Sequence, residues 1–170
     1  MQEILVISDS HGLTNRVQKI KDRHNISTMI HCGDSELPND HPFIEDLTIV
    51  QGNCDRPGEF NEEEQLTIDG LNIYVTHGHL YQVKSDLLSL TYRAEEVGAH
   101  IVCFGHSHIA GAEKIDGRLY INPGSIRYPR RIKERTYVIL SWENPSVIKV
   151  QFLDLDGNEL GELSRTFHLN

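Results

Sequence analysis

Five short apolar segments of this chain each end in side chains that can bind a metal ion, and this repeated pattern constrains the fold most strongly. The side chains are carboxylates, imidazoles and one amide. Binding sites in open α/β sheets form beyond the carboxyl ends of strands, so these segments are expected to converge in space. The residues are Asp9 and His11, Asp34, Asn53, His77 and His79, and His106 and His108.

The first half of the chain alternates expected strands and helices. Apolar runs predict strands at 3–8, 28–31, 47–51, 66–69, 72–76 and 100–104. Apolar residues at helical spacing predict helices at 14–24 and 86–97. Thr14 is expected to cap the first helix, and Gly98 is expected to mark the end of the second.

The second half of the chain turns to hairpins. Asp-Gly pairs at 116–117 and 156–157 are strong turn signals. Apolar runs predict strands at 112–115, 118–121, 136–142, 147–153 and 162–168. The predicted fold class is therefore α/β, with two stacked mixed sheets and helices outside. We expect one domain spanning residues 1–170, a length that can bury a substantial core.

Charge, cysteine content and hydropathy narrow the setting of the protein. The net charge of −9 argues against general nucleic-acid binding, which depends on Lys and Arg. Three cysteines in no disulfide-like array favour a reducing, cytoplasmic location. The chain has no apolar run of about 18 residues and no positively charged leader, so neither a membrane helix nor a signal peptide is expected.

The chemistry of the polar set points to divalent cations. Each motif alone has an ordinary explanation, because Asp-x-His often caps a loop and Gly-Asp is a common turn. Together they form a set of seven oxygen and imidazole ligands without an essential thiolate, which suits Mn, Fe, Zn, Ni or Mg. That set is too large for one ion with open positions. It favours two ions about 3.5–4 Å apart that share a carboxylate and clamp a phosphate.

The motifs resemble those of the calcineurin-like metallophosphoesterase superfamily. They are Ser-Asp-Ser-His-Gly at 8–12, Gly-Asp at 33–34, Gly-Asn-Cys-Asp at 52–55, Thr-His-Gly-His at 76–79 and Gly-His-Ser-His at 105–108. The Asn-Pro-Gly-Ser loop at 122–125 resembles the corresponding loop in the small bacterial and archaeal phosphodiesterase branch of that superfamily. A retromer subunit has the same fold without enzymatic activity. The resemblance implies a four-layer sandwich of two mixed β-sheets flanked by helices.

The resemblance also implies a role for each ligand. The first metal would be bound by Asp9, His11 and His108, the second by Asn53, His77 and His106, and Asp34 would bridge them. Asp34 and Asn53 are the predicted catalytic residues, manganese is the metal expected first, and His79 is predicted as an outer partner. Many members of the superfamily have His where this chain has Cys54, so Cys54 is predicted as a second outer partner. The missing imidazole implies weak hydrolysis of monoesters with poor leaving groups.

A basic segment at 127–135 stands out in this acidic chain, with five basic residues among nine. It fits a solvated loop, a rim that binds substrate phosphate, or a subunit interface, and a homo-oligomer is left open. The predicted substrate-binding residues are Asn122, Ser125, Arg130 and Arg131. The histidines outside the motifs, His31 among them, are expected to be surface or packed residues.

The predicted function is hydrolysis of phosphate esters by a hydroxide that bridges two metal ions, with small phosphodiesters as the preferred substrates. Two alternatives remain open. A phosphomonoesterase or nucleotide pyrophosphohydrolase would use the same site. A non-catalytic scaffold would keep the fold for protein binding, but loss of ligands is the expected mark of such a scaffold. All seven ligand positions are filled in this chain.

Overall fold

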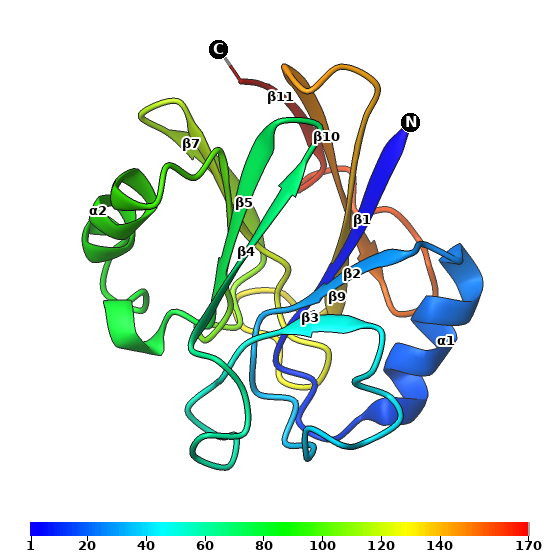
Figure 1. Ribbon diagram of the computed structural model, residues 1–170. Coiled ribbons are helices and arrows are strands. Elements are labelled where there is room, and N and C mark those ends of the chain that lie inside the picture. Colours follow the sequence, from blue (N-terminus) through cyan, green and yellow to red (C-terminus); the bar gives the residue numbers. More distant parts are fainter. Residues whose placement is uncertain (170) are drawn as a thin grey trace.

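The apolar runs form two mixed β-sheets in the computed structural model of the protein (Figure 1). The structure describes residues 1–169; Asn170, the last residue of the predicted domain, lies outside them. The strands are β1 (Gln2–Ile7), β2 (Thr28–His31), β3 (Leu47–Ile49), β4 (Glu63–Ile68), β5 (Leu71–Thr76), β6 (Ile101–Cys103), β7 (Gly111–Ile115), β8 (Arg118–Asn122), β9 (Thr136–Trp142), β10 (Val147–Asp154) and β11 (Arg165–His168).

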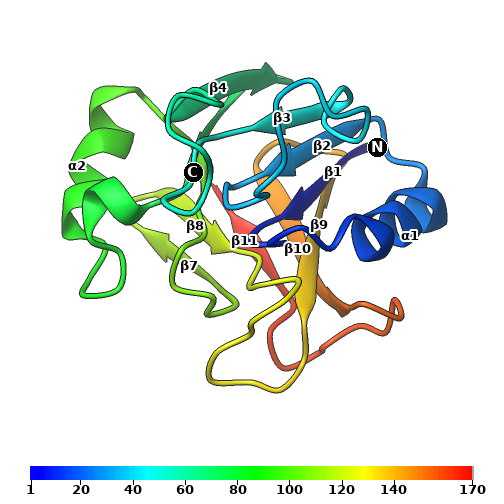
Figure 2. The same ribbon diagram turned by 90° about the horizontal axis from the view of Figure 1, so that it is seen from below.

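Each sheet contains three parallel strands, and this arrangement positions the site. One sheet has the order β11-β10-β9-β1-β2-β3, with β1, β2 and β3 parallel. The other has the order β4-β5-β6-β8-β7, with β5, β6 and β8 parallel. The loops after these six strands gather at the lower edge of the molecule, which Figure 2 shows from below. Segments far apart in sequence therefore meet at one end of the sandwich, as predicted.

The two helices cover the outer faces of the sheets. Helix α1 (Thr14–His24) buries Val17 and Ile20 in a cluster with residues of β1, β2 and β9. Helix α2 (Leu88–Glu96) buries Leu90 and Ala94 against β5, β6 and β8. Full burial of such a branched side chain contributes about 1.5–3 kcal/mol. A third apolar cluster lies between the sheets, so the molecule has four layers, as the resemblance implied.

Several local predictions need correction. Thr14 is already helical, Leu13 precedes the helix, and no side chain caps it. Strand β4 begins at Glu63, three residues before the predicted start at residue 66. Its acidic first residues hid it from an apolar pattern, and they are held by pairing with β5 and by a salt bridge from Glu63 to Arg93. Gly98 follows α2 in the left-handed conformation that its predicted position required. None of the helices among residues 1–169 is long and apolar enough to cross a bilayer.

Candidate metal centre

Five of the seven predicted ligands adopt the left-handed backbone conformation, which residues other than glycine rarely adopt. They are Asp9 (φ 52°), His11 (42°), Asp34 (59°), His106 (68°) and His108 (58°). This conformation costs an L-residue roughly 1–2 kcal/mol, and such strain gathers at functional sites. The sharp bends let each loop turn its side chains toward the other loops at the end of the sandwich.

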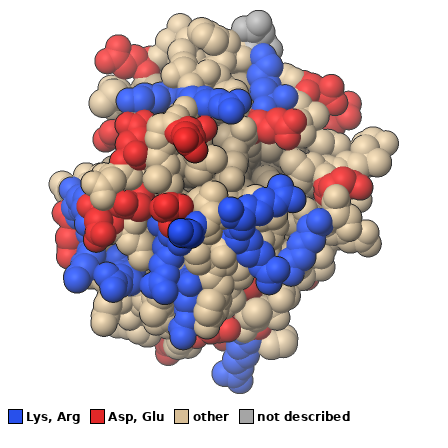
Figure 3. Space-filling view, turned by 180° about the vertical axis from the view of Figure 1, so that it is seen from behind, with Lys and Arg blue, Asp and Glu red and all other residues tan. Residues whose placement is uncertain are grey.

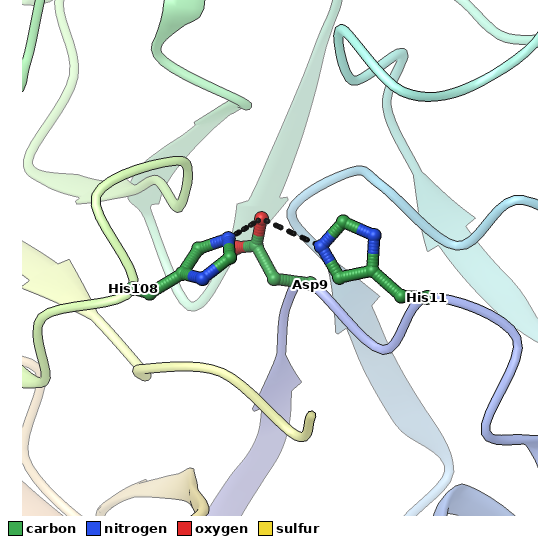
Figure 4. Close-up of side chains that lie close together, drawn as sticks. All are labelled: Asp9, His11 and His108. Atoms are coloured by element: carbon green, nitrogen blue, oxygen red, sulfur yellow. Dashed lines mark ion pairs between the residues drawn. The ribbon is translucent and has the colours of Figure 1, made fainter. Parts of the chain in front are cut away.

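The first cluster consists of Asp9, His11 and His108 (Figure 4). The Oδ1 atom of Asp9 lies 3.0 Å from Nε2 of His108 and 3.9 Å from Nε2 of His11. Asp9 is fully buried, yet its Oδ1 atom and Nε2 of His11 have no hydrogen-bond partner among the described residues. Buried polar atoms rarely lack a partner. Two such atoms facing each other fit a cation held between them.

The second cluster consists of Asp34, His77 and Asn53. Nε2 of His77 lies 3.2 Å from Oδ2 of Asp34 and 3.1 Å from Oδ1 of Asn53. The two clusters share their carboxylates: Asp34 Oδ2 is 3.9 Å from His11 Nε2, and Asp9 Oδ1 is 3.8 Å from His77 Nε2. Both carboxylates thus stand between the clusters, and Asp34 as the bridging ligand stays a prediction.

Backbone carbonyl groups fix the orientation of two ligand histidines. Nδ1 of His77 donates to the carbonyl oxygen of Cys32 at 2.7 Å. Nδ1 of His108 donates to the carbonyl oxygen of Tyr128 at 2.8 Å. In the neutral ring a proton on Nδ1 leaves the lone pair of Nε2 free, and in each of the two rings Nε2 faces a carboxylate oxygen. This is the arrangement that outer partners impose on metal-binding imidazoles.

The predicted ligand His106 and its neighbour His79 lie beside the second cluster. The His106 ring centroid is 5.1 Å from that of His77, and the His79 centroid is 5.3 Å from it. Burial, followed by the charge of His77, lowers the pKa of His106 to about 4, so its ring is neutral and able to bind a cation. Among the described residues three groups of ligand atoms converge, the third being His11, Glu36 and Cys54, and His106 belongs to none of them. Its role as a ligand therefore stays a prediction.

The charges of the two clusters support each other. Burial raises the pKa of Asp9, but the close approach of the His108 ring and the charges of His77 and His108 outweigh it, so the pKa is lowered overall. For Asp34, burial is likewise outweighed by the hydrogen bond and charge of His77. The pKa of His77 is raised, because these carboxylates outweigh the effect of burial. Two ionised carboxylates in a buried site are suited to cations.

Two residues beneath the site were not expected from sequence to have a role there. Asp55 accepts hydrogen bonds from the backbone N–H groups of Asp34 (2.9 Å), Glu36 (2.7 Å) and Gly52 (2.7 Å). His31 is fully buried and joins two ligand loops, because it lies 2.8 Å from Ser10 Oγ and accepts from Gly33 N–H at 3.1 Å. Their adjacency to Gly-Asp and Gly-Asn in sequence was the available signal.

Two motif glycines are required by close approach of the loops. A Cβ atom on Gly52 would lie 2.0 Å from Oδ1 of Asp34, and one on Gly105 would lie 2.1 Å from Oγ of Ser8. Separations this short are not found between real Cβ atoms and their neighbours. The Gly-Asn and Gly-His pairs therefore need glycine so that the ligands of neighbouring loops can meet.

The predicted substrate-binding residues Asn122 and Ser125 lie inside the protein. Both are buried, and Ser125 Oγ donates to the carbonyl oxygen of Asp9 at 2.9 Å. The Asn122 amide donates to the carbonyl oxygen of Gly105 and to Ser107 Oγ. Their burial gives no support to direct substrate contact, and that role stays a prediction. They follow β8 and hold the Asp9 loop and the 105–108 loop in place.

Arg130, Arg131 and Cys54 are exposed, unlike those two residues. The backbone N–H of Arg130 donates to the carbonyl oxygen of His108, which places the basic segment at the rim of the first cluster. The segment lies on the face opposite to that of Figure 1, where Figure 3 shows Lys and Arg side chains gathered across the middle. The backbone N–H of Cys54 donates to Asp34 Oδ1 at 2.7 Å, so Cys54 contacts a ligand as an outer partner would.

Comparison with known proteins agrees with this geometry. Residues 2–145 match the model of the calcineurin-like phosphoesterase superfamily domain. The chain is 52% identical to the probable metallophosphoesterase YsnB of Bacillus subtilis, with 94% of this chain and 95% of that protein covered. A crystal structure of a conserved uncharacterised protein, a predicted phosphoesterase from Streptococcus pneumoniae, superposes with a TM-score of 0.92 at 36% identity, covering 98% and 97%.

A structure described as that of a novel archaeal phosphodiesterase superposes with a TM-score of 0.68 at 25% identity, covering 89% of this chain and 100% of that one. The chain therefore belongs to the calcineurin-like phosphoesterase superfamily. The family is metal-dependent, and the two clusters, the first with Asp9 Oδ1 and His11 Nε2 unpartnered among the described residues, are suited to that dependence.

Proposed function

We propose that this chain is a phosphodiesterase that works with two divalent metal ions, manganese first among them. The observation that carries the proposal is the pair of clusters that share Asp9 and Asp34, with Asp9 Oδ1 and His11 Nε2 lacking hydrogen-bond partners among residues 1–169. Asp9, His11 and His108 would hold one ion, and Asn53, His77 and His106 the other. Bound together, two such ions supply a nucleophilic hydroxide at neutral pH and neutralise charge on the phosphate.

The chain itself supplies orientation and charge. Asp34 is held by Cys54 N–H and by the Asp55 carboxylate behind its own N–H, so its side chain keeps one position between the clusters. The cationic rim at 127–135 would attract an anionic ester and orient it at the opening of the site. The aromatic ring of Tyr128, 52% exposed, lies 5.3 Å from the His11 ring and forms part of this opening.

The leaving group receives little help with its proton from Cys54. Burial, then the charge of Asp34, raises the pKa of the Cys54 thiol to about 11, so the thiol stays protonated and is a poor acid. A positioned general acid contributes about 10²–10⁴-fold when the leaving alkoxide needs a proton. Esters whose alcohol leaves as a stable anion do not need it. This supports activated diesters as better substrates than alkyl monoesters.

The test compares bis(nitrophenyl) phosphate, nitrophenyl phosphate and an alkyl phosphate with the manganese-loaded protein. We expect the diester to be cleaved fastest and the alkyl ester slowest. Cys54→His should narrow the gap for the alkyl ester without changing metal content, because Cys54 is not one of the proposed ligands. A preference for the monoester would replace the diesterase by the phosphomonoesterase alternative. No turnover of any ester by the loaded protein would favour the scaffold.

A further inference from the structure

The first cluster contains a histidine that is oriented differently from the others. The Nδ1 atoms of His77 and His108 donate to backbone carbonyl groups. Nδ1 of His11 faces a side chain instead, the carboxylate of Glu36, with Oε1 at 3.3 Å. A backbone carbonyl group is present whatever the residue, whereas a carboxylate at position 36 requires Asp or Glu. The identity of residue 36 therefore affects the geometry of this ligand alone.

The backbone of Glu36 is held in a position from which its side chain reaches His11. Its backbone is left-handed, with φ at 58°, and its N–H donates to Oδ1 of Asp55 at 2.7 Å. Asp55 is 4% exposed and its other oxygen accepts from Asp34 N–H. The backbone of Glu36 is thus tied to the same carboxylate that holds Asp34, and it lies at a fixed place relative to both clusters.

Stability gives no sufficient reason for a carboxylate at this position. The Glu36 side chain is 43% exposed, and a pair with an exposed partner contributes at most about 1 kcal/mol. The left-handed conformation costs a similar amount or more. Glu36 is one of eleven non-glycine residues with this conformation among the described residues, and five of the eleven are predicted ligands. Strain of this kind is tolerated where position matters for function.

We propose that Glu36 is a positioning residue for the metal centre. Its carboxylate accepts a hydrogen bond from Nδ1–H of His11 and turns Nε2 toward Asp9 and His108. Nε2 of His11 lies 3.9 Å from both Oδ1 of Asp9 and Oδ2 of Asp34 and has no hydrogen-bond partner among the described residues, so a cation bound there would meet a ligand that is already oriented. The negative charge of Glu36 would also make the imidazole a stronger donor to the ion.

The test measures metal binding and the protonation of His11, and catalysis is not a readout. Removal of such a partner typically weakens metal affinity by about 10–100-fold. We expect that loss for Glu36→Ala in competition between the protein and a chromophoric chelator for Mn²⁺ or Zn²⁺. Glu36→Gln keeps an acceptor oxygen without the charge, so its affinity should fall between those of wild type and Glu36→Ala.

Nitrogen-15 NMR of the metal-free protein reports the His11 tautomer directly. We expect one tautomer, protonated at Nδ1, in wild type and in Glu36→Gln, and a mixture in Glu36→Ala. The matched control is Glu62→Ala, which removes an exposed carboxylate whose charge acts on His79. It should leave affinity and tautomer unchanged.

Two results would overturn the proposal. One is wild-type affinity, within a factor of two, in Glu36→Ala together with an unchanged His11 tautomer. The other is an equal loss of affinity in Glu62→Ala, since that would show a general effect of charge. If Glu36→Ala does not fold, the partial loss and retained tautomer expected of Glu36→Gln still decide the question. Because no readout is turnover, a protein without esterase activity would contradict the proposed function and not this inference.

Discussion

Asp34 is one of two carboxylates that lie between the clusters. Its carboxylate contacts His77, lies within 3.9 Å of His11, and accepts from Cys54 N–H. We predict that Asp34→Asn lowers kcat/KM for an activated diester by more than about 100-fold, which is the upper value for loss of an outer partner. An amide cannot supply the negative charge that two neighbouring cations need.

The measurement for Asp34→Asn pairs kinetics with metal analysis of the same sample. His108 supplies the comparison, because it belongs to the first cluster only. Its replacement by Ala should remove one ion more than the other, whereas Asp34→Asn should weaken both. Intact activity with two ions at full occupancy in Asp34→Asn would show that the bridging assignment is wrong.

His31 gives the metal-free protein a defined dependence of stability on pH. Burial is the largest cause that lowers its pKa, to about 4, from an ordinary value of 6.5. Between these values the unfolded chain binds a proton at His31 and the folded chain does not. Stability therefore falls as pH falls through this window, by about 2 kcal/mol between pH 7 and pH 5 for this group.

Chemical denaturation of wild type and His31→Gln at pH 7 and pH 5 tests this expectation. Gln can still donate to Ser10 but does not titrate, so it lacks this loss. The difference in unfolding free energy between the two proteins should shrink, or reverse, by about 2 kcal/mol at the lower pH. A difference that stays constant would mean that His31 is not held neutral in the folded state.

The sequence predicted which polar side chains would converge at one edge, but it did not predict the residues that support them. Asp9, His11 and His77 stand directly after apolar runs, where parallel strands deliver their side chains to a shared edge. Asn122 was predicted as a substrate contact from its loop motif, and the sequence does not show whether a loop amide is exposed or buried. Its burial depends on how the loop after β8 packs beneath Gly105, and that is a tertiary property.

At the scale of elements, the basic segment 127–135 is the feature whose role is least fixed. It holds His11 and His108 through its backbone and through Arg127, whose guanidinium donates to the carbonyl oxygen of His11 at 2.6 Å. The side chains of Arg130 and Arg131 point outward and are exposed. The segment therefore combines support for the ligands with a free cationic surface.

Neutralising Arg130 and Arg131 together should raise KM for anionic diesters by about 3–10-fold with little change in kcat, because exposed charges mainly steer and bind. The effect should fade with added salt, since exposed charges are screened within about 10 Å at 0.1 M. Steady-state kinetics at low and high ionic strength measure it. An unchanged KM at low salt would leave the segment as a solvated loop or an interface.

The elements themselves were largely predictable from apolar patterning. β2 and β9 have the predicted bounds, and each has an apolar centre, Met29–Ile30 and Tyr137–Leu140. β4 was predicted too short, because it lies at the edge of its sheet and its first residues are polar, so an apolar pattern does not detect them. The end of α2 was marked by Gly98, whereas the start of α1 had a capping residue in sequence and none in the structure.

At the scale of the whole molecule, the fold joins two half-sites from two sheets. The strands β1, β2 and β3 deliver Asp9, His11, Asp34 and Asn53 from one sheet, and β5 and β6 deliver His77, His106 and His108 from the other. The apolar layer between the sheets sets their separation, so the two sets of ligands meet only in the folded protein. Metal binding should therefore stabilise the fold as well as enable chemistry.

The most direct test of a two-metal phosphoesterase is a titration of metal-free protein with Mn²⁺, in which bound ions and hydrolysis of bis(nitrophenyl) phosphate are measured in the same samples. We expect the metal-free protein to be inactive. Activity should rise steeply only as the second equivalent of metal binds, and a chelator should abolish it. Full activity in verified metal-free protein, or at one bound equivalent, would show that hydrolysis does not need two metal ions.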